Sequence, residues 1–187
     1  MRNRGELLLI APSGFISSVE LDEVARALAP RLIGYALART GCVGTAEDVA
    51  QDALTALVRR WRQAGPPESP DAFAFAIARR RAGRVIARRA LMAPLEVIRD
   101  LAGNEPSIEH TYEHRAELAI VRSALRTLSR SDREALLLRS VGELSFEQIA
   151  VVVGASAAAV KMRISRARRR LAASVEDQSN GRQKRTA

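Results

Sequence analysis

The stretch between Ser145 and Leu171 constrains the fold more than any other, because it reads as two helices joined by a tight turn. Ser145 and Gln148 have the spacing of a capping box, which predicts a helix that begins at the next residue. Gly154 can adopt the left-handed conformation that ends this helix, and Ser156 can cap the second one. Apolar residues then recur at helical steps: Val160, Ile164, Ala167 and Leu171. The stretch therefore predicts a helix-turn-helix.

The second helix of this motif is basic on the face away from its apolar stripe. Its cations are Lys161, Arg163, Arg166, Arg169 and Arg170. Such a row would displace counterions from a duplex, and the first residues of the helix, around Ala157 to Lys161, would lie nearest the base edges. An ordinary helical hairpin with a solvated basic face would show the same pattern, so both interpretations stay open here.

Composition favours a polyanionic partner and excludes several classes of protein. The 187 residues carry a formal net charge of +9, with a sequence pI near 11.1. Cys42 is the only cysteine, which rules out an intramolecular disulfide and agrees with a reducing compartment, so we expect a cytoplasmic protein. No apolar run approaches the roughly 20 residues of a membrane span, and no membrane association is expected. Few aromatics and no alternating patterns predict an all-helical fold.

The first half predicts a small helical domain over residues 20–90, preceded by a loose arm over 1–19. A first helix should run from Leu21 to Arg39. Thr45, paired with Asp48, should cap a second helix that ends near Gln63. A third helix should start after Ser69, with a proline and an acid in its first turn, and run to about residue 89.

The second of these helices carries an acidic and amide-bearing face in an otherwise basic chain. The face comprises Glu47, Asp48, Gln51, Asp52 and Thr55. The helix dipole explains acids in the first turn, at about 0.3–1 kcal/mol each, but its effect fades before Asp52. We therefore expect this face to dock a basic protein partner.

The third helix is crowded with arginines, which favours an anionic partner. They are Arg79, Arg80, Arg81, Arg84, Arg88 and Arg89. Like charges this dense destabilise a helix unless something neutralises them, and a nucleic-acid backbone would do so. Phe75 and Trp61 could stack on exposed bases, although both suit a hydrophobic core equally well.

A second domain is predicted over residues 113–173, after an aperiodic linker over 91–112. Helical spacing returns from Glu113 to Leu128. Ser131 and Glu134 form another capping-box pattern, opening a helix that Gly142 ends just before the helix-turn-helix. Residues 174–187 are polar and aperiodic, and we expect a disordered tail. The expected architecture is two small helical domains joined by a flexible linker.

Four segments, in this order, resemble the extracytoplasmic-function (ECF) type of bacterial sigma factor, a branch of the sigma-70 family. AEDVAQDALTALVRRW, residues 46–61, is similar to region 2.2, and SPDAFAFAIARRR, residues 69–81, to regions 2.3 to 2.4. LSRSDREALLLR, residues 128–139, and the long stretch 144–171 are similar to regions 4.1 and 4.2. The chain departs from the family's usual residues at three positions, where it has Phe73, Arg80 and Ala159.

The resemblance implies a transcription initiation factor that guides core RNA polymerase to promoters. The first domain would capture the minus-10 element as its strands separate, through Phe73, Phe75, Arg79, Arg80, Arg81, Arg84 and Arg88. The second would bind the minus-35 element as duplex, through Ser156, Ala157, Ala158, Ala159, Lys161, Arg163, Arg166 and Arg169. It further implies that Asp48, Gln51, Asp52 and Thr55 dock on the clamp helices of the polymerase beta-prime subunit.

The same resemblance implies contact with the polymerase beta flap, an anti-sigma factor as a regulator, no cofactor and no catalytic residue. One alternative is a stand-alone helix-turn-helix regulator, which would leave the acidic face and the arginine-rich helix without a role. Another is an enzyme built on Glu109, His110, Glu113 and His114, whose histidines have metal-ligand spacing. That set lacks a zincin arrangement and any further His or Cys ligand, which argues against it.

Overall fold

The computed structural model describes residues 13–92, 123–125 and 127–186, and side chains within 19–92, 123–125 and 127–176. The described chain is all-helical, as predicted. The helices are α1 (Ser13–Thr40), α2 (Val43–Ala64), α3 (Pro70–Met92), α5 (Arg130–Ser140), α6 (Phe146–Val153) and α7 (Ala157–Thr186). The expected linker therefore falls outside the described residues from 93 onward, as does most of the helix expected from Glu113.

Helix α1 begins at Ser13, so the prediction of a loose arm as far as residue 19 is wrong for its last residues. The helix also runs through Pro30 without a break. Its apolar residues Leu21, Leu28 and Leu32 are buried in the core that the helices share. Burial of this face offsets the backbone hydrogen bond that the proline removes.

Helix α2 starts three residues earlier than predicted, so the expected cap at Thr45 is wrong. The cap position is Cys42, without a side-chain cap bond, and Gly41 makes the preceding turn at φ 68°. Thr45 lies inside the first turn, where its hydroxyl oxygen accepts a hydrogen bond from Arg89 Nη2 at 2.7 Å. The buried face of α2 consists of apolar residues that run from Ala46 to Trp61.

Helix α3 starts as the sequence predicts. The Ser69 hydroxyl accepts a hydrogen bond from the Ala72 amide at 3.2 Å, and Pro70 and Asp71 occupy the first turn. The helix extends to Met92, three residues beyond the predicted end. Small residues such as Ala78 and Ala82 are buried, which lets α3 pack closely against α1 and α2.

The helix-turn-helix is confirmed in detail. The Ser145 hydroxyl accepts from the Gln148 amide and the Gln148 side chain accepts from the Ser145 amide, which completes the capping box. Gly154 takes the left-handed conformation, at φ 69° and ψ 48°, and the axes of α6 and α7 cross at 101°. The apolar stripe of α7 is buried along Val160, Ile164 and Ala167.

Two predictions around this motif need correction. Helix α5 is capped by Ser129, whose hydroxyl accepts from the Asp132 amide, and not by Ser131 with Glu134. Helix α7 continues to Thr186, so the expected disordered tail from residue 174 is wrong. Once a helix is nucleated, each added residue costs little, and Ala172 and Ala173 are strong helix formers that carry α7 onward.

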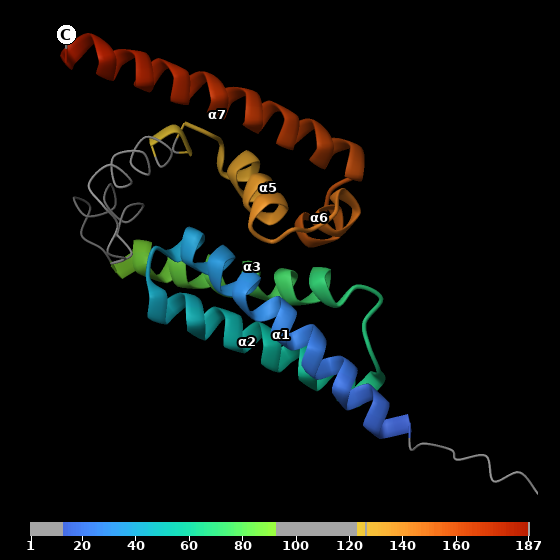
Figure 1. Ribbon diagram of the computed structural model, residues 1–187. Helices are drawn as coiled ribbons and strands as arrows, with labels where there is room; N and C mark the ends of the chain where they lie inside the picture. The colour runs from blue at the N-terminus through green and yellow to red at the C-terminus, as the bar shows by residue number, and fades with distance from the viewer. Residues whose placement is uncertain (1–12, 93–122, 126, 187) are drawn as a thin grey trace, which may run out of the picture.

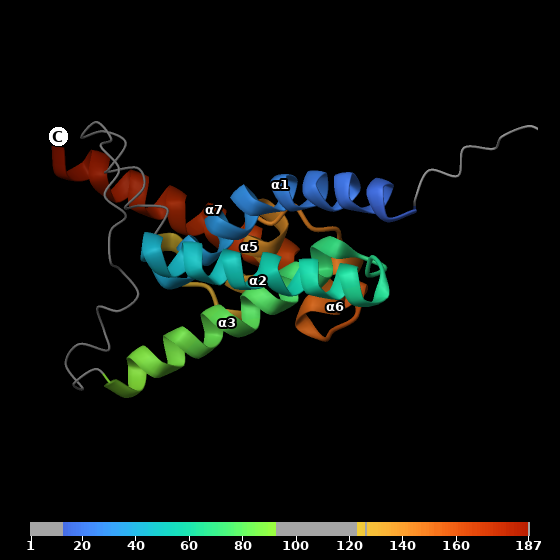
Figure 2. The same ribbon diagram turned by 90° about the horizontal axis from the view of Figure 1, so that it is seen from below.

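The helices form two layers that share one hydrophobic core. Figure 1 shows α1, α2 and α3 below and α5, α6 and α7 above, and α2 lies on the side of the lower layer away from the upper one, as Figure 2 also shows. Helix α3 contacts α6 and α1 contacts α5, and one cluster of buried residues runs through both layers. In the described segments no single helix could cross a membrane by length and hydropathy, although α6 and the following part of α7 pass that test as a bent pair.

Candidate nucleic-acid interface

The start of α7 presents the predicted duplex-reading residues at the surface. Ser156, Ala158, Lys161, Arg166 and Arg169 are exposed, and the remaining members of the set, Ala157, Ala159 and Arg163, are half-buried. The Ser156 hydroxyl caps the helix by accepting from the Ala159 amide at 3.2 Å. The arrangement leaves a basic helix whose first turn is open to a major groove.

The acidic face of α2 is also at the surface. Asp48, Gln51, Asp52 and Thr55 are all exposed, on the helix that lies farthest from the helix-turn-helix. Asp52 forms an ion pair with Arg81, with Oδ2 and Nε 3.2 Å apart and both side chains 47% exposed. An exposed pair contributes only about 0–1 kcal/mol, so a partner's cation could replace Arg81 at little cost.

The predicted minus-10 residues divide into exposed and covered groups. Arg80, Arg81, Arg84 and Arg88 are exposed along α3. Phe73 is half-buried and Arg79 keeps 37% of its side chain exposed.

The suggestion that Phe75 or Trp61 offers a stacking surface is wrong for this conformation. Phe75 is 0% and Trp61 4% exposed. The Phe75 ring packs edge-on against Tyr35, with centroids 5.5 Å apart, and the Arg31 guanidinium lies 5.7 Å from its centroid. A residue in the loop after α5, Gly142, covers the ring from the other layer, since a Cβ there would lie 3.0 Å from Phe75 Cε1.

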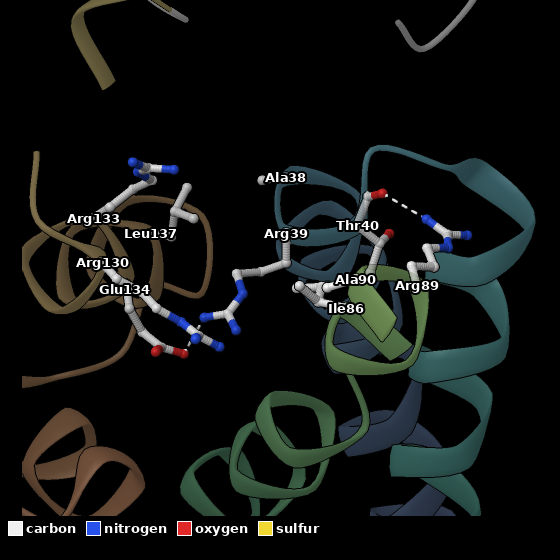
Figure 3. A pocket seen from close by; sticks show the side chains of 10 residues that line it. All are labelled: Ala38, Arg39, Thr40, Ile86, Arg89, Ala90, Arg130, Arg133, Glu134 and Leu137. Atoms are coloured by element: carbon white, nitrogen blue, oxygen red, sulfur yellow. Dashed lines mark hydrogen bonds and ion pairs between the residues drawn. The ribbon is translucent and has the colours of Figure 1, made fainter. Parts of the chain in front are cut away.

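The contact between the two layers is here called the seam. The layer of α1 to α3 contributes Arg31, Tyr35, Arg39, Ser69, Phe75 and Arg79. The layer of α5 to α7 contributes Glu134, Val141, Gly142, Glu143 and Gln148. Glu134, 8% exposed, is the polar centre of the seam (Figure 3). One oxygen, Oε1, accepts from the Tyr35 hydroxyl at 2.8 Å and pairs with Arg39 at 2.5 Å and with Arg79 at 3.2 Å. Burial raises the pKa of Tyr35, which keeps its hydroxyl a donor to Glu134.

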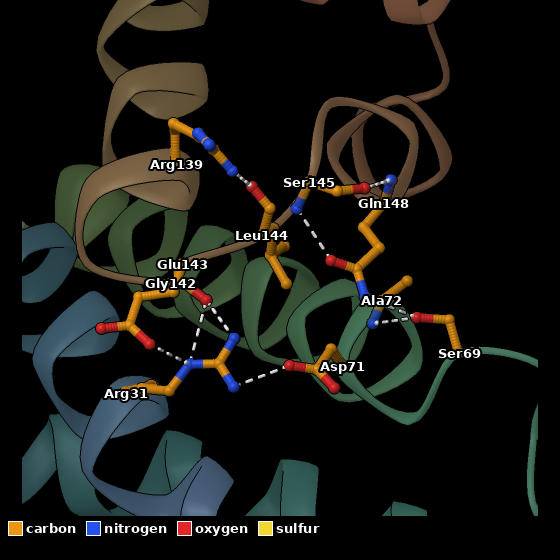
Figure 4. Close-up of polar contacts among 10 residues, drawn as sticks. All are labelled: Arg31, Ser69, Asp71, Ala72, Arg139, Gly142, Glu143, Leu144, Ser145 and Gln148. Atoms are coloured by element: carbon orange, nitrogen blue, oxygen red, sulfur yellow. Dashed lines mark hydrogen bonds and ion pairs between the residues drawn. The ribbon is translucent and has the colours of Figure 1, made fainter.

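The other end of the seam is held by Arg31 (Figure 4). Its guanidinium donates two hydrogen bonds to the Gly142 carbonyl and pairs with Asp71 at 2.7 Å and with Glu143 at 3.6 Å. Gln148, which completes the capping box of α6, also donates to the Ser69 hydroxyl at 3.1 Å. Ser69 and Gln148 therefore each have two roles: each caps a helix of its own layer, and the two are hydrogen-bonded to each other across the seam.

Cys42 lies where α1 passes to α2, beside Arg89 of α3. Hydrogen bonds from the side chain and backbone of Thr45 stabilise the thiolate and lower the pKa of Cys42 to about 7. Arg89 contributes in the same sense, and it also donates to the Thr40 carbonyl at 3.0 Å. The thiol is half-buried and free.

Within the described residues, His, Cys, Asp and Glu side chains form no group of three or more that could hold a metal ion. The candidate set of Glu109, His110, Glu113 and His114 lies outside them. The sequence missed the seam altogether, because Glu134 and Gln148 were explained as capping residues. Their spacing gives no signal of a second role.

Two family models match the chain. The description "Sigma-70 region 2" matches residues 24–91, and "Sigma-70, region 4" matches residues 118–171. Among curated proteins, the RNA polymerase sigma factor CnrH of Cupriavidus metallidurans is 36% identical over 88 residues, which cover 47% of this chain and 46% of that protein. The uncharacterized protein R00370 of Rhizobium meliloti is 30% identical over 153 residues, 77% of this chain and 36% of its own length. The matches thus span about half or less of these relatives.

Two solved structures have the same fold. One is the sigma factor RpoE in complex with the anti-sigma factor NepR from Bartonella quintana, with a TM-score of 0.63 and 24% identity over 85% of this chain and 96% of that one. The other is CnrH in complex with the cytosolic domain of CnrY, with a TM-score of 0.59 and 24% identity over 88% and 94%. With both regions matched in the family's order on the helices described above, this chain belongs to the sigma-70 family and is an ECF-type sigma factor.

Proposed function

We propose that the chain is a transcription initiation factor that binds core RNA polymerase and directs it to promoters. The observation that carries the proposal is the exposed acidic face of α2 in a chain of net charge +9, which adjoins the basic surface of α3 through the Asp52–Arg81 pair and lies on a different helix from the basic surface of α7. An acidic face repels DNA and attracts a basic protein surface, whereas the two basic helices suit two promoter segments. Polymerase performs the phosphodiester chemistry.

The proposed roles follow the surfaces. Asp48, Gln51, Asp52 and Thr55 dock on the beta-prime clamp helices, and the helix-turn-helix domain contacts the beta flap. The first turn of α7 reads the minus-35 duplex in the major groove, where each base pair shows a distinct pattern. Helix α3 receives the minus-10 element through its exposed arginines, which can pair with the phosphates of its backbone.

We further propose an anti-sigma factor as the regulator. Support comes from the two similar structures, which are both complexes of a sigma factor with such a partner. The inducing signal would then act on that partner.

The test is a pull-down with core polymerase, followed by transcription from a genomic fragment library. Replacing Gln51 and Asp52 together by alanine should reduce core association by about tenfold or more, because two of the four polar side chains of the docking face are lost. The matched control removes one amide and one carboxylate elsewhere, at Gln63 and Glu68, which are exposed beyond the docking face.

Unchanged core binding in the Gln51 and Asp52 variant would contradict the docking role. Specific, tight binding of promoter duplex by a chain that ignores core polymerase would favour the stand-alone regulator instead. Circular dichroism should be the same for both variants, because all four side chains are exposed.

A further inference from the structure

One cavity of this protein is lined by several arginines and a single acid. Its volume is about 390 Å³, which lies within the range of small-molecule sites. Figure 3 shows the side chains of α5 on one side of it and those of α1 and α3 on the other. Its charged lining, among the described residues, consists of Arg39, Arg89, Arg130, Arg133 and Glu134. Four guanidinium groups therefore share a cavity with one carboxylate.

The contacts within the cavity fix the guanidinium groups without balancing their charge. One oxygen of Glu134 is already shared between Arg39 and Arg79, and the Arg39 side chain is only 9% exposed. Arg89 donates to the Thr45 hydroxyl at 2.7 Å and to a backbone carbonyl at 3.0 Å, neither of which carries a charge. Positive charge collected in a hollow attracts anions, and side chains that are already ordered lose little freedom when an anion binds.

The start of α5 places cations where a helix disfavours them. Arg130 and Arg133 lie in its first turn, near the positive end of the helix dipole, where anions are favourable and cations are not. The acid of this turn, Asp132, does not line the cavity, and it pairs instead with Arg170 of α7 at 3.8 Å. An anion bound beside Arg130 and Arg133 would offset their unfavourable position.

The cavity has an apolar part as well as a cationic one. The apolar part consists of Ala38, Ile86, Ala90 and Leu137. A neighbouring cavity of about 490 Å³ shares Arg39, Arg130 and Glu134 with the first, and is otherwise lined by Arg79, Arg80, Gly83 and Ser131. The combined site is therefore apolar at one end and strongly cationic where the two cavities meet. This composition suits a small molecule with an apolar or aromatic body and a multiply charged anionic group.

We propose that this site binds a nucleoside diphosphate or a similar small molecule with two or more phosphate groups on an aromatic body. The phosphates lie beside Arg39 and Arg130, and the base packs on Ile86, Ala90 and Leu137. Guanidinium groups suit this role because their paired N–H donors match the oxygens of a phosphate group. The proposed minus-35 and docking residues do not line the site, and the proposal does not rest on the function proposed above.

The ligand class is tested by equilibrium dialysis of the full chain against ADP at about 0.15 M salt, where the attraction of exposed surface charges is screened. ADP should bind saturably at one site per chain. It should bind about tenfold more tightly than AMP, which lacks one phosphate, and about tenfold more tightly than pyrophosphate, which leaves the apolar part empty. The absence of saturable binding, or equal affinity for ADP and either of the other two compounds, would overturn the proposal.

The location is tested with variants that separate shape from charge. Ala90→Trp fills the apolar part without changing the charge and should weaken ADP binding by at least about tenfold. Its matched control is Ala87→Trp, the same change at an exposed position of α3 that lines neither cavity. Arg130→Gln should weaken binding by about tenfold, because one charge-assisted contact is lost. Arg59→Gln removes an equal charge from an exposed site on α2 and should bind ADP as the wild type does.

All four variants should fold as the wild type does, as measured by circular dichroism, because each replaced side chain is exposed. Equal losses in Ala90→Trp and Ala87→Trp, or in Arg130→Gln and Arg59→Gln, would show that ADP is held by the net charge of the chain and not by this cavity. Either result would overturn the site.

Discussion

Glu134 fits a capping pattern on its own helix, yet its side chain makes its contacts with the other domain. Its spacing from Ser131 matches a capping box, yet Ser129 caps α5 and Glu134 turns to the other domain. Local spacing records only which neighbours a side chain could reach along its own helix. A partner 99 residues away leaves no trace in that spacing, so the sequence could not reveal the seam.

A pH-dependent reactivity is expected at Cys42. Because hydrogen bonds from Thr45 lower the pKa of Cys42 to about 7, the thiolate should predominate above that pH and disappear below it. The rate of alkylation by iodoacetamide should therefore have its midpoint near pH 7, rather than near 8.5 as for an ordinary thiol.

Thr45→Ala should raise that midpoint, whereas Thr45→Ser, which keeps the hydroxyl, should leave it nearly in place. A wild-type midpoint in the ordinary thiol range would show that Thr45 does not stabilise the thiolate.

The positions and caps of single helices were the features that the sequence predicted best. The capping box of α6, the left-handed Gly154 and the start of α3 at Pro70 all follow from short-range chemistry and are confirmed. Errors occur at helix ends: α1 starts earlier, α3 ends later, and α7 continues past residue 174. Helix ends depend on propagation and tertiary burial, which fixed local signals do not record.

Two glycines provide a test of this local chemistry. At Gly154, φ is +69° and a Cβ would meet nothing within 4 Å, so Gly154→Ala should cost about 1–2 kcal/mol through backbone strain alone. Gly83 lies inside α3 with equally open space but without a positive φ. Gly83→Ala should therefore stabilise the fold by about 0.5–1 kcal/mol.

The shifts can be measured by urea unfolding followed by circular dichroism. Changes of the same sign at both positions would refute the conformational explanation, because the added methyl group is the same and only φ differs.

At the scale of the whole molecule, the net positive charge attracts any polyanion, whereas particular side chains make the contacts with promoter DNA. A net charge of +9 attracts DNA everywhere, whereas the exposed Arg166 lies on the proposed recognition helix. Arg166→Ala should reduce the slope of log affinity against log salt by about 0.9 for minus-35 duplex, because one phosphate contact is lost.

Arg59→Ala removes an equal charge from α2, where the side chain is exposed, and should leave the slope unchanged. The comparison requires fluorescence anisotropy over a salt series. Equal slopes for the two variants would mean that Arg166 makes no phosphate contact.

The sequence predicted the family, the two helical domains and the exposed position of the acidic and basic surfaces. It could not predict that Phe75 is buried, since an aromatic residue at that position suits a core and a stacking platform equally well. Phe75 is buried between Tyr35 of its own domain and the loop of the other domain at Gly142. Contacts between domains arise from the assembled shape and not from any one segment.

The absent side chain of Gly142 has a practical consequence. Its φ is not positive, so other residues could adopt its backbone, but a Cβ would lie 2.6 Å from the Leu138 carbonyl oxygen and 3.0 Å from Phe75. A side chain at this position would therefore press on the backbone of α5 as well as on the Phe75 ring. Position 142 is therefore the place where a single substitution would most directly disturb the packing of one layer on the other.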